Sequence, residues 1–121
     1  MNRFRRAVRN LTAETQELEA DELLQEVTDA GATTVEQCPD RVPVAVFGTV
    51  RALTIRPRGG VPALEAELYD GTGTVTLVWL GRRTIAGLHP GRRLRAFGRI
   101  TTAHGERFIY NPKYELTAVD N

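Results

Sequence analysis

The stretch 70–83, DGTGTVTLVWLGRR, constrains the fold more than any other part of the chain. It opens with Asp70, Gly71 and Gly73, residue types that supply the positive φ angles of a tight reversal. Residues 75–80 then form a run of high β-propensity. The preceding segment, 62–69, alternates between apolar and polar residues, which is typical of a strand with one buried face. Residues 62–80 are therefore predicted to form a β-hairpin.

Further strands are predicted on both sides of this hairpin. Residues 44–56 form a long first strand with a bulge or bend near Ala52 and Leu53, where the face pattern slips, and residues 57–61 form a hairpin loop. A short helical turn and a loop follow residue 81. A fourth strand is predicted over 92–102 and a fifth over 107–110, and 114–119 is a tail that adds one more extended piece. Gly48 and Gly98 face inward, where they suit strands that bend to close a small barrel.

This layout predicts a mainly β fold: a five-stranded OB-fold barrel with an N-terminal α-helical extension. The helical turn between the third and fourth strands belongs to that layout. An SH3-like barrel is the alternative all-β architecture, but it offers no reason for this turn.

Charge divides the chain into three blocks. Residues 1–10 hold four arginines and no acid, residues 11–40 hold nine acids and no Lys or Arg, and residues 41–121 hold twelve basic and six acidic residues, a net of +6.

We expect residues 1–31 to be a helical arm with a basic tip and an acidic helix, in which Thr12 caps the start of a second helical segment. Residues 32–43 are a linker, and residues 44–121 are the OB-fold domain.

The acidic helix carries one apolar stripe, made by Ala20, Leu23, Leu24, Val27 and Ala30. This stripe either packs on the barrel or pairs with another chain. If the helix folds against the barrel, its acids could compete with nucleic acid for the arginines of the body, or they could face water while the stripe only covers apolar surface.

Several classes of protein are excluded by the composition. No run of about 18 apolar residues exists, so no membrane span is predicted. Cys38 is the single cysteine, which rules out an internal disulfide and fits a cytoplasmic location. His89 and His104 make no metal-ligand spacing with it. No nucleophile–base set is visible, so we expect no enzyme activity, no metal and no cofactor.

The sequence also resembles a known family over residues 44–116. Five motifs carry the resemblance. The first three are a G-x-V strand at Gly48 and Val50, a D-G-T-G turn at residues 70–73, and a strand with an aromatic residue, Trp79. The last two are a P-G-x-x-L-x-x-x-G strand, with Pro90, Gly91, Leu94 and Gly98, and an N-P-x-Y segment that ends the series, with Pro112 and Tyr114. This series resembles the OB-fold nucleic-acid-binding family, in particular the wedge domain of RecG-type branch-migration helicases. Small actinobacterial proteins with an acidic helix before a single OB-fold look similar.

The resemblance implies binding of single-stranded or branched DNA. It does not imply a helicase, because the chain contains no GxxxxGK(S/T) phosphate-binding loop. RNA is the alternative nucleic-acid ligand.

Arginine provides most of the positive charge, and it can bind phosphate with two hydrogen bonds and stack on bases. Arg93, Arg95 and Arg99 are predicted on one exposed strand face with Phe97 between them, a pattern typical of strands that bind single-stranded nucleic acid. Arg51 is the expected partner of Glu65 or Glu67, and Trp79 is expected in the core. The candidate phosphate-binding residues are Arg51, Arg56, Arg58, Arg82, Arg83, Arg95, Arg99 and Arg107, and the candidate stacking residues are Tyr69, Phe97 and Tyr110.

Two functions are consistent with these patterns. The first is non-enzymatic binding of single-stranded or branched DNA, with affinity that falls steeply as salt rises. The second is a protein-interaction adaptor that uses the OB-fold and a partner docked on the N-terminal helix. Glu65 and Glu67, which lie on the outward face of the second strand, favour the adaptor.

Overall fold

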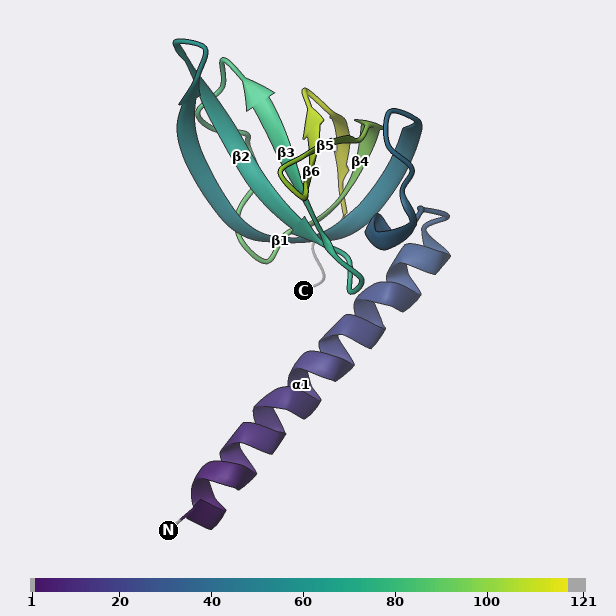
Figure 1. The fold of residues 1–121 in the computed structure, drawn as a ribbon, viewed down its shortest axis with the longest axis vertical. Helices are drawn as coiled ribbons and strands as arrows, with labels where there is room; N and C mark the ends of the chain where they lie inside the picture. The colour runs from purple at the N-terminus through teal and green to yellow at the C-terminus, as the bar shows by residue number, and fades with distance from the viewer. Residues whose placement is uncertain (1, 118–121) are drawn as a thin grey trace.

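The computed structural model describes the backbone of residues 2–117 and the side chains of residues 16–117. Over this range the chain forms one long helix, one 3-10 turn and seven strands (Figure 1). The elements are α1 (Asn2–Asp29), η1 (Val35–Gln37), β1 (Pro43–Arg58), β2 (Val61–Tyr69), β3 (Thr74–Leu80), β4 (Arg93–Arg99), β5 (Thr101–Ala103), β6 (Glu106–Tyr110) and β7 (Lys113–Leu116).

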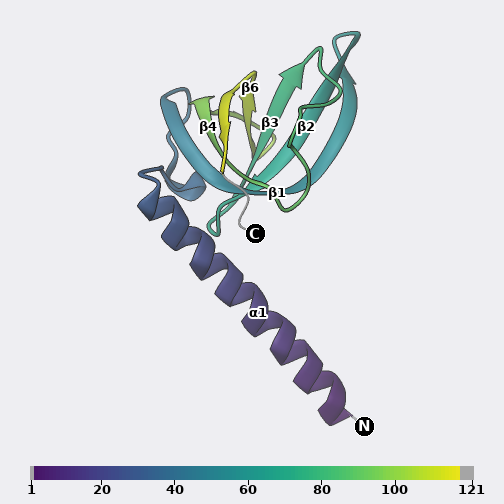
Figure 2. The same cartoon turned by 180° about the vertical axis from the view of Figure 1, so that it is seen from behind.

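The strands form one sheet in the order β5-β6-β3-β2-β1-β4-β7. All neighbours are antiparallel except β3 and β6, which are parallel. β4 and β5 lie near opposite ends of this order, yet only Ile100 separates them in the chain. The sheet therefore curls until its two ends approach each other, which gives a partly open, OB-like barrel (Figures 1 and 2).

The predicted mainly β fold with an N-terminal helix is confirmed, but the predicted number of five strands is wrong. The segment 92–102 does not run as one strand: it divides at Ile100 into β4 and β5, because the chain must pass from one end of the sheet to the other there. The tail pairs with β4 as β7, with Ala96 opposite Tyr114.

The core fills the inside of the barrel with the inward side chains of β1, β2, β3, β4 and β6. Trp79 is 5 % exposed, as predicted for a core residue, and its Nε1 donates a hydrogen bond to the carbonyl oxygen of Pro112 at 3.1 Å. Gly48 lies so close to β2 that a Cβ atom there would collide with the carbonyl oxygen of Tyr69. The inward glycine therefore lets two strands approach where a side chain would separate them.

β1 bends at the predicted position. Its pairing with β2 shifts between Val50 and Ala52, which leaves Arg51 as the extra residue of a bulge. Beyond the bulge the pairing continues to Arg58 opposite Val61, so the hairpin loop is only the pair Gly59–Gly60, with φ angles of 57° and 83°. The predicted loop of residues 57–61 is therefore too long, and Arg58, which it included, belongs to β1.

The connection between β3 and β4 contains turns and no helix, so the predicted helical turn is wrong. Gly81, Gly87 and Gly91 have φ angles of 78°, 80° and 92°, and a left-handed residue at this spacing interrupts any helical run. The buried side chains of Ile85 and Leu88 anchor this connection to the core.

The turn between β2 and β3 depends on Asp70 in a different way from the prediction. Only Gly71, with a φ angle of 95°, takes a positive value there. The Asp70 carboxylate instead accepts hydrogen bonds from the backbone N–H groups of Thr72 and Gly73 at 2.8 Å and 3.1 Å, and from that of Val35 at 2.6 Å. This carboxylate connects the segment before β1 to the hairpin, and Val35 is fully buried in the core.

α1 is one continuous helix, and the second start predicted at Thr12 does not occur. Among the described side chains of α1, the contacts with the barrel begin at Glu19, and the N-terminal part of the helix backbone stands away from the barrel (Figure 1). Within the predicted stripe Leu23 and Val27 are buried, whereas Leu24 is 39 % exposed, so this part of the stripe packs on the barrel. The predicted basic tip lies outside the residues whose side chains are described. No helix within the described range combines the length and the apolar character needed to cross a membrane.

Candidate nucleic-acid interface

A groove of about 550 Å³ lies on the outer face of the barrel, between the β1–β2 turn and the β5–β6 turn. The strands around it place apolar side chains inward and polar side chains outward, as strand alternation requires. Its lining residues are Thr54, Arg56 and Arg58 of β1, Glu65 and Glu67 of β2, Thr74 and Thr76 of β3, Gly105 of the turn, and Glu106, Arg107 and Phe108 of β6.

Two aromatic rings of β6 lie side by side at this groove. Phe108 and Tyr110 share the outer face because Ile109 between them points into the core, where it is fully buried. The ring centroids are 6.1 Å apart and the ring planes differ by 23°. The Arg58 guanidinium lies 5.5 Å from the Phe108 centroid and 5.6 Å from the Tyr110 centroid, within the range of cation–π attraction.

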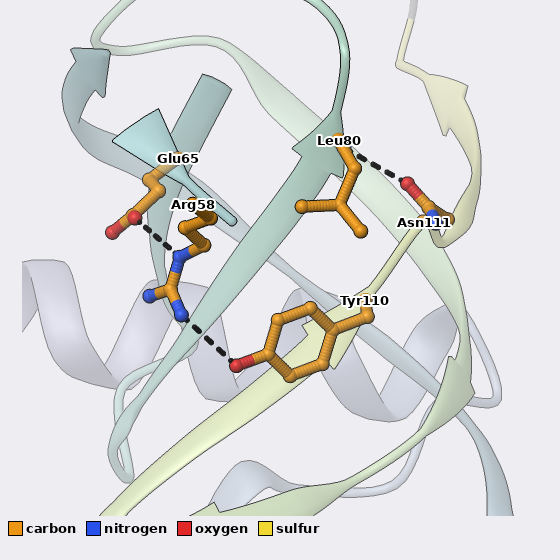
Figure 3. Close-up of polar contacts among 5 residues, drawn as sticks. All are labelled: Arg58, Glu65, Leu80, Tyr110 and Asn111. Atoms are coloured by element: carbon orange, nitrogen blue, oxygen red, sulfur yellow. Dashed lines mark hydrogen bonds and ion pairs between the residues drawn. The ribbon is translucent and has the colours of Figure 1, made fainter. Parts of the chain in front are cut away.

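Arg58 is held by two further contacts, which Figure 3 shows. Its Nε donates to Glu65 Oε2 at 2.9 Å, and its Nη1 donates to the Tyr110 hydroxyl at 3.1 Å. The hydrogen bond to Glu65 is the main cause that raises the pKa of Arg58 above its usual value. Glu65 is 8 % exposed, so its carboxylate needs this partner. Arg51, the partner expected from the sequence, is not the partner of Glu65.

Asn111 fixes the end of β6 directly after Tyr110 (Figure 3). It adopts a φ angle of 51°, and its backbone N–H donates to the Val78 carbonyl at 2.6 Å. Its side-chain Oδ1 accepts a hydrogen bond from the backbone N–H of Leu80 at 2.9 Å. Asn111 therefore ties the end of β6 to β3 through both its backbone and its side chain, and these bonds hold the preceding residue, Tyr110, in position.

The groove contains equal numbers of opposite charges. Arg56, Arg58 and Arg107 face Glu65, Glu67 and Glu106 in the same lining. Arg58 is paired with Glu65, whereas Arg56 and Arg107 make no ion pair within the described residues. Arg107 Nη2 donates one hydrogen bond to the carbonyl oxygen of Glu36 at 3.2 Å, which leaves its charge unpaired. Arg56 and Arg107 are therefore the groove arginines whose charge remains for an anionic ligand. The site is therefore an aromatic and polar groove with little net charge.

A second group of arginines lies against α1 instead of the groove. Arg51 stacks on the ring of Tyr69 with its guanidinium carbon 3.9 Å from the centroid, and its Nη2 lies 3.9 Å from Glu19 Oε1. Arg93 Nε lies 2.9 Å from Glu26 Oε2. Arg95 donates to the carbonyl oxygen of Ala30.

The prediction of an exposed cationic face on the fourth strand is therefore wrong in part. Arg93, Arg95 and Phe97 are half-buried, and Arg99 alone of these four is exposed. The C-terminal end of α1 accounts for the contacts of Arg93 and Arg95, and β7 adds a strand beside Phe97, which pairs with Lys113.

The sequence-predicted site residues thus fall into separate places. The groove brings together Arg56, Arg58 and Arg107, with Tyr110 against Arg58. Arg51, Tyr69 and Arg95 lie in the second group, Arg82 and Arg83 are exposed in the β3–β4 connection, and Phe97 and Arg99 belong to β4.

Phe108 was not among the predicted residues. The signal that could have identified it is its two-residue spacing from Tyr110, which puts both rings on one face of a strand.

Among the described residues, no three His, Cys, Asp or Glu side chains gather where they could hold a metal ion. His89 and His104 are exposed and lie in turns.

No protein-family model and no curated protein matches this sequence. A solved structure of a Replication Protein A heterotrimer bound to ssDNA contains a chain with a similar fold, with a TM-score of 0.51 and 12% sequence identity. The likeness covers 74% of this chain and 75% of that chain. At this identity the likeness concerns the fold.

Proposed function

We propose that this protein is a non-enzymatic binder of single-stranded or branched DNA, and that the groove beside Phe108 is its binding site. The observation that carries the proposal is the pair of adjacent rings, Phe108 and Tyr110, with the Arg58 guanidinium over both. Aromatic rings in a groove with cations are the usual means of holding unpaired bases, because every base has a face that stacks.

The position of the groove supports the proposal. OB-folds commonly bind oligonucleotides on the face of their second and third strands, between the loops after the first and fourth strands. Here the groove lies on β2 and β3, between the β1–β2 turn and the turn before β6. The structural neighbour, a Replication Protein A heterotrimer, was solved with ssDNA. The resemblance to the wedge domain adds branched DNA as a ligand.

The charges of the groove predict a shallow salt dependence. With Arg58 engaged by Glu65, Arg56 and Arg107 are the groove cations expected to contact phosphates. Two phosphate contacts on a single strand correspond to a slope of about −1.4 in log K against log salt. This replaces the steep dependence expected from the eight arginines named from the sequence.

Fluorescence anisotropy with a labelled single-stranded oligonucleotide tests the proposal, and a forked duplex serves as the branched probe. Phe108→Ala is expected to weaken binding by roughly 5- to 150-fold, the range for losing one stacked base. Phe97→Ala is the matched control, because it removes another half-buried ring from a strand outside the groove. Absence of binding at low salt, or equal losses in the two variants, would reject the proposed site.

A protein-interaction adaptor is the second candidate. It is favoured by the helix that stands away from the barrel, on which Leu18 is 62 % exposed and Leu24 is 39 % exposed. A pull-down from nuclease-treated lysate separates the two functions. A partner that survives nuclease and is lost in the Leu18→Glu variant would favour the adaptor.

A further inference from the structure

Glu67 differs from the other acid of β2 that lines the groove. Glu65 is buried and its carboxylate is engaged by Arg58, whereas Glu67 is exposed. Within the described part of the chain Glu67 makes no ion pair and no side-chain hydrogen bond. An unpaired carboxylate in a site for a polyanion repels phosphate, so its presence in the groove requires a different explanation.

The strand register places Glu67 in line with the stacking ring. Glu67 pairs with Thr76 across β2 and β3, and Thr76 pairs with Phe108 across β3 and β6. Two strand spacings separate the backbones of Glu67 and Phe108 by about 10 Å. Thr76 between them is short and half-buried, so the space above it is open to the groove. A base stacked on Phe108 can extend one edge over Thr76 toward the Glu67 carboxylate.

The chemistry of a carboxylate selects which edge can face it. An ionised carboxylate only accepts hydrogen bonds, and its two oxygens match a pair of adjacent donors. The Watson–Crick edge of guanine offers such a pair, the N1–H and the 2-amino group. Adenine and cytosine offer one amino group next to an acceptor nitrogen, and thymine places its imino group between two carbonyl oxygens. The carboxylate is therefore matched best by guanine and least by thymine.

We infer that Glu67 is a specificity-determining residue that selects guanine at the base stacked on Phe108. This inference rests on the proposed function. It explains why the groove, whose net charge is small, carries the free carboxylate of Glu67 in line with Phe108: base recognition contributes where phosphate attraction is small.

The test uses oligothymidylates that differ at one central position, which holds guanine, hypoxanthine or thymine, at one fixed salt concentration. The guanine oligonucleotide is expected to bind roughly tenfold tighter than the all-thymine one, within the range for a bidentate contact to a base. Hypoxanthine lacks the 2-amino group and is expected to fall between the two. Anisotropy gives the three dissociation constants directly.

The matched variants are Glu67→Ala and Glu115→Ala. Each removes one exposed carboxylate and changes the net charge equally, but Glu115 lies on β7 outside the groove. The inference expects the guanine preference to disappear in Glu67→Ala and to persist in Glu115→Ala. Equal binding of the three oligonucleotides by the unmodified protein, or a preference that survives Glu67→Ala, overturns the inference and leaves the proposed function standing. Absence of binding to all three overturns both.

Discussion

Replacing Asp70 by alanine is expected to destabilise the fold strongly. Its side chain is fully buried between the β2–β3 turn and the segment before β1. Oδ2 accepts the Val35 N–H at 2.6 Å, and Oδ1 accepts the Thr72 N–H, the Thr72 hydroxyl and the Gly73 N–H at 2.8, 2.7 and 3.1 Å. Alanine leaves all four donors without this partner.

The magnitude follows from the burial of each donor. A buried donor left without a partner costs roughly 1–3 kcal/mol, and bonds to a charged acceptor lie at the upper end. The bond to Val35 is buried, so its loss is expected to cost about 2–3 kcal/mol, whereas the partly buried Thr72 and Gly73 groups recover part of their loss from water. The total is about 4 kcal/mol, a large share of the roughly 5–15 kcal/mol that stabilises a typical domain.

Thermal and urea unfolding, followed by circular dichroism and by the fluorescence of buried Trp79, measure this loss. For a domain of this size the midpoint is expected to fall by roughly 10–20 °C. Asp40→Ala is the control, because Asp40 Oδ1 also accepts one backbone N–H, that of Thr102 at 3.0 Å, but at an exposed site. Its expected cost is below about 1 kcal/mol. A midpoint within about 3 °C of the unmodified protein for Asp70→Ala, or equal losses in both variants, would refute the reasoning.

Further predictions concern the thiol, a core glycine and the N-terminal segment. Burial, and to a smaller extent the nearby Asp70 carboxylate, raise the pKa of the Cys38 thiol, so the thiolate fraction at pH 7–8 is low. Labelling of Cys38 by a disulfide reagent should therefore be slow until urea unfolds the chain. Labelling of the native protein as fast as that of a free thiol would contradict this. Gly48→Ala drives a methyl group into the Tyr69 carbonyl and should unfold the protein or cost at least about 3 kcal/mol in urea titration; near-normal stability would contradict it. A chain that starts at residue 40 loses the buried Val35 and should lack a cooperative unfolding transition; a stable truncated barrel would show that the segment is dispensable.

Local patterns predicted the strands because alternation and turn residues act over a few positions. The hairpin of 62–80, the bulge near Ala52 and the core position of Trp79 all follow from such patterns, and the structure confirms them. The division of the fourth strand at Ile100 could not be predicted in this way, because it depends on which strands lie at the two ends of the sheet.

The residues named for the site stay a prediction, but the structure shows where they lie. The sequence does not show that the C-terminal end of α1 and the residue after it lie against Arg93 and Arg95. Glu65 was interpreted as an outward acid, whereas Arg58 and Tyr110 bury it in a network that joins three strands. Such contacts join residues far apart in the chain, beyond the reach of any local pattern.

The order in which strands pair has a consequence for how the chain folds. The first half of β1 pairs with β4, so that Pro43 lies opposite Arg99. β3 pairs on one side with β6, which is synthesised later. Folds dominated by such distant contacts form in milliseconds to seconds, far more slowly than helical domains. During synthesis the β1–β2–β3 meander can form early, but one edge of β1 stays unpaired until the last third of the chain has emerged. An unpaired edge can recruit strands from other chains, so the nascent protein is most exposed to aggregation in that interval.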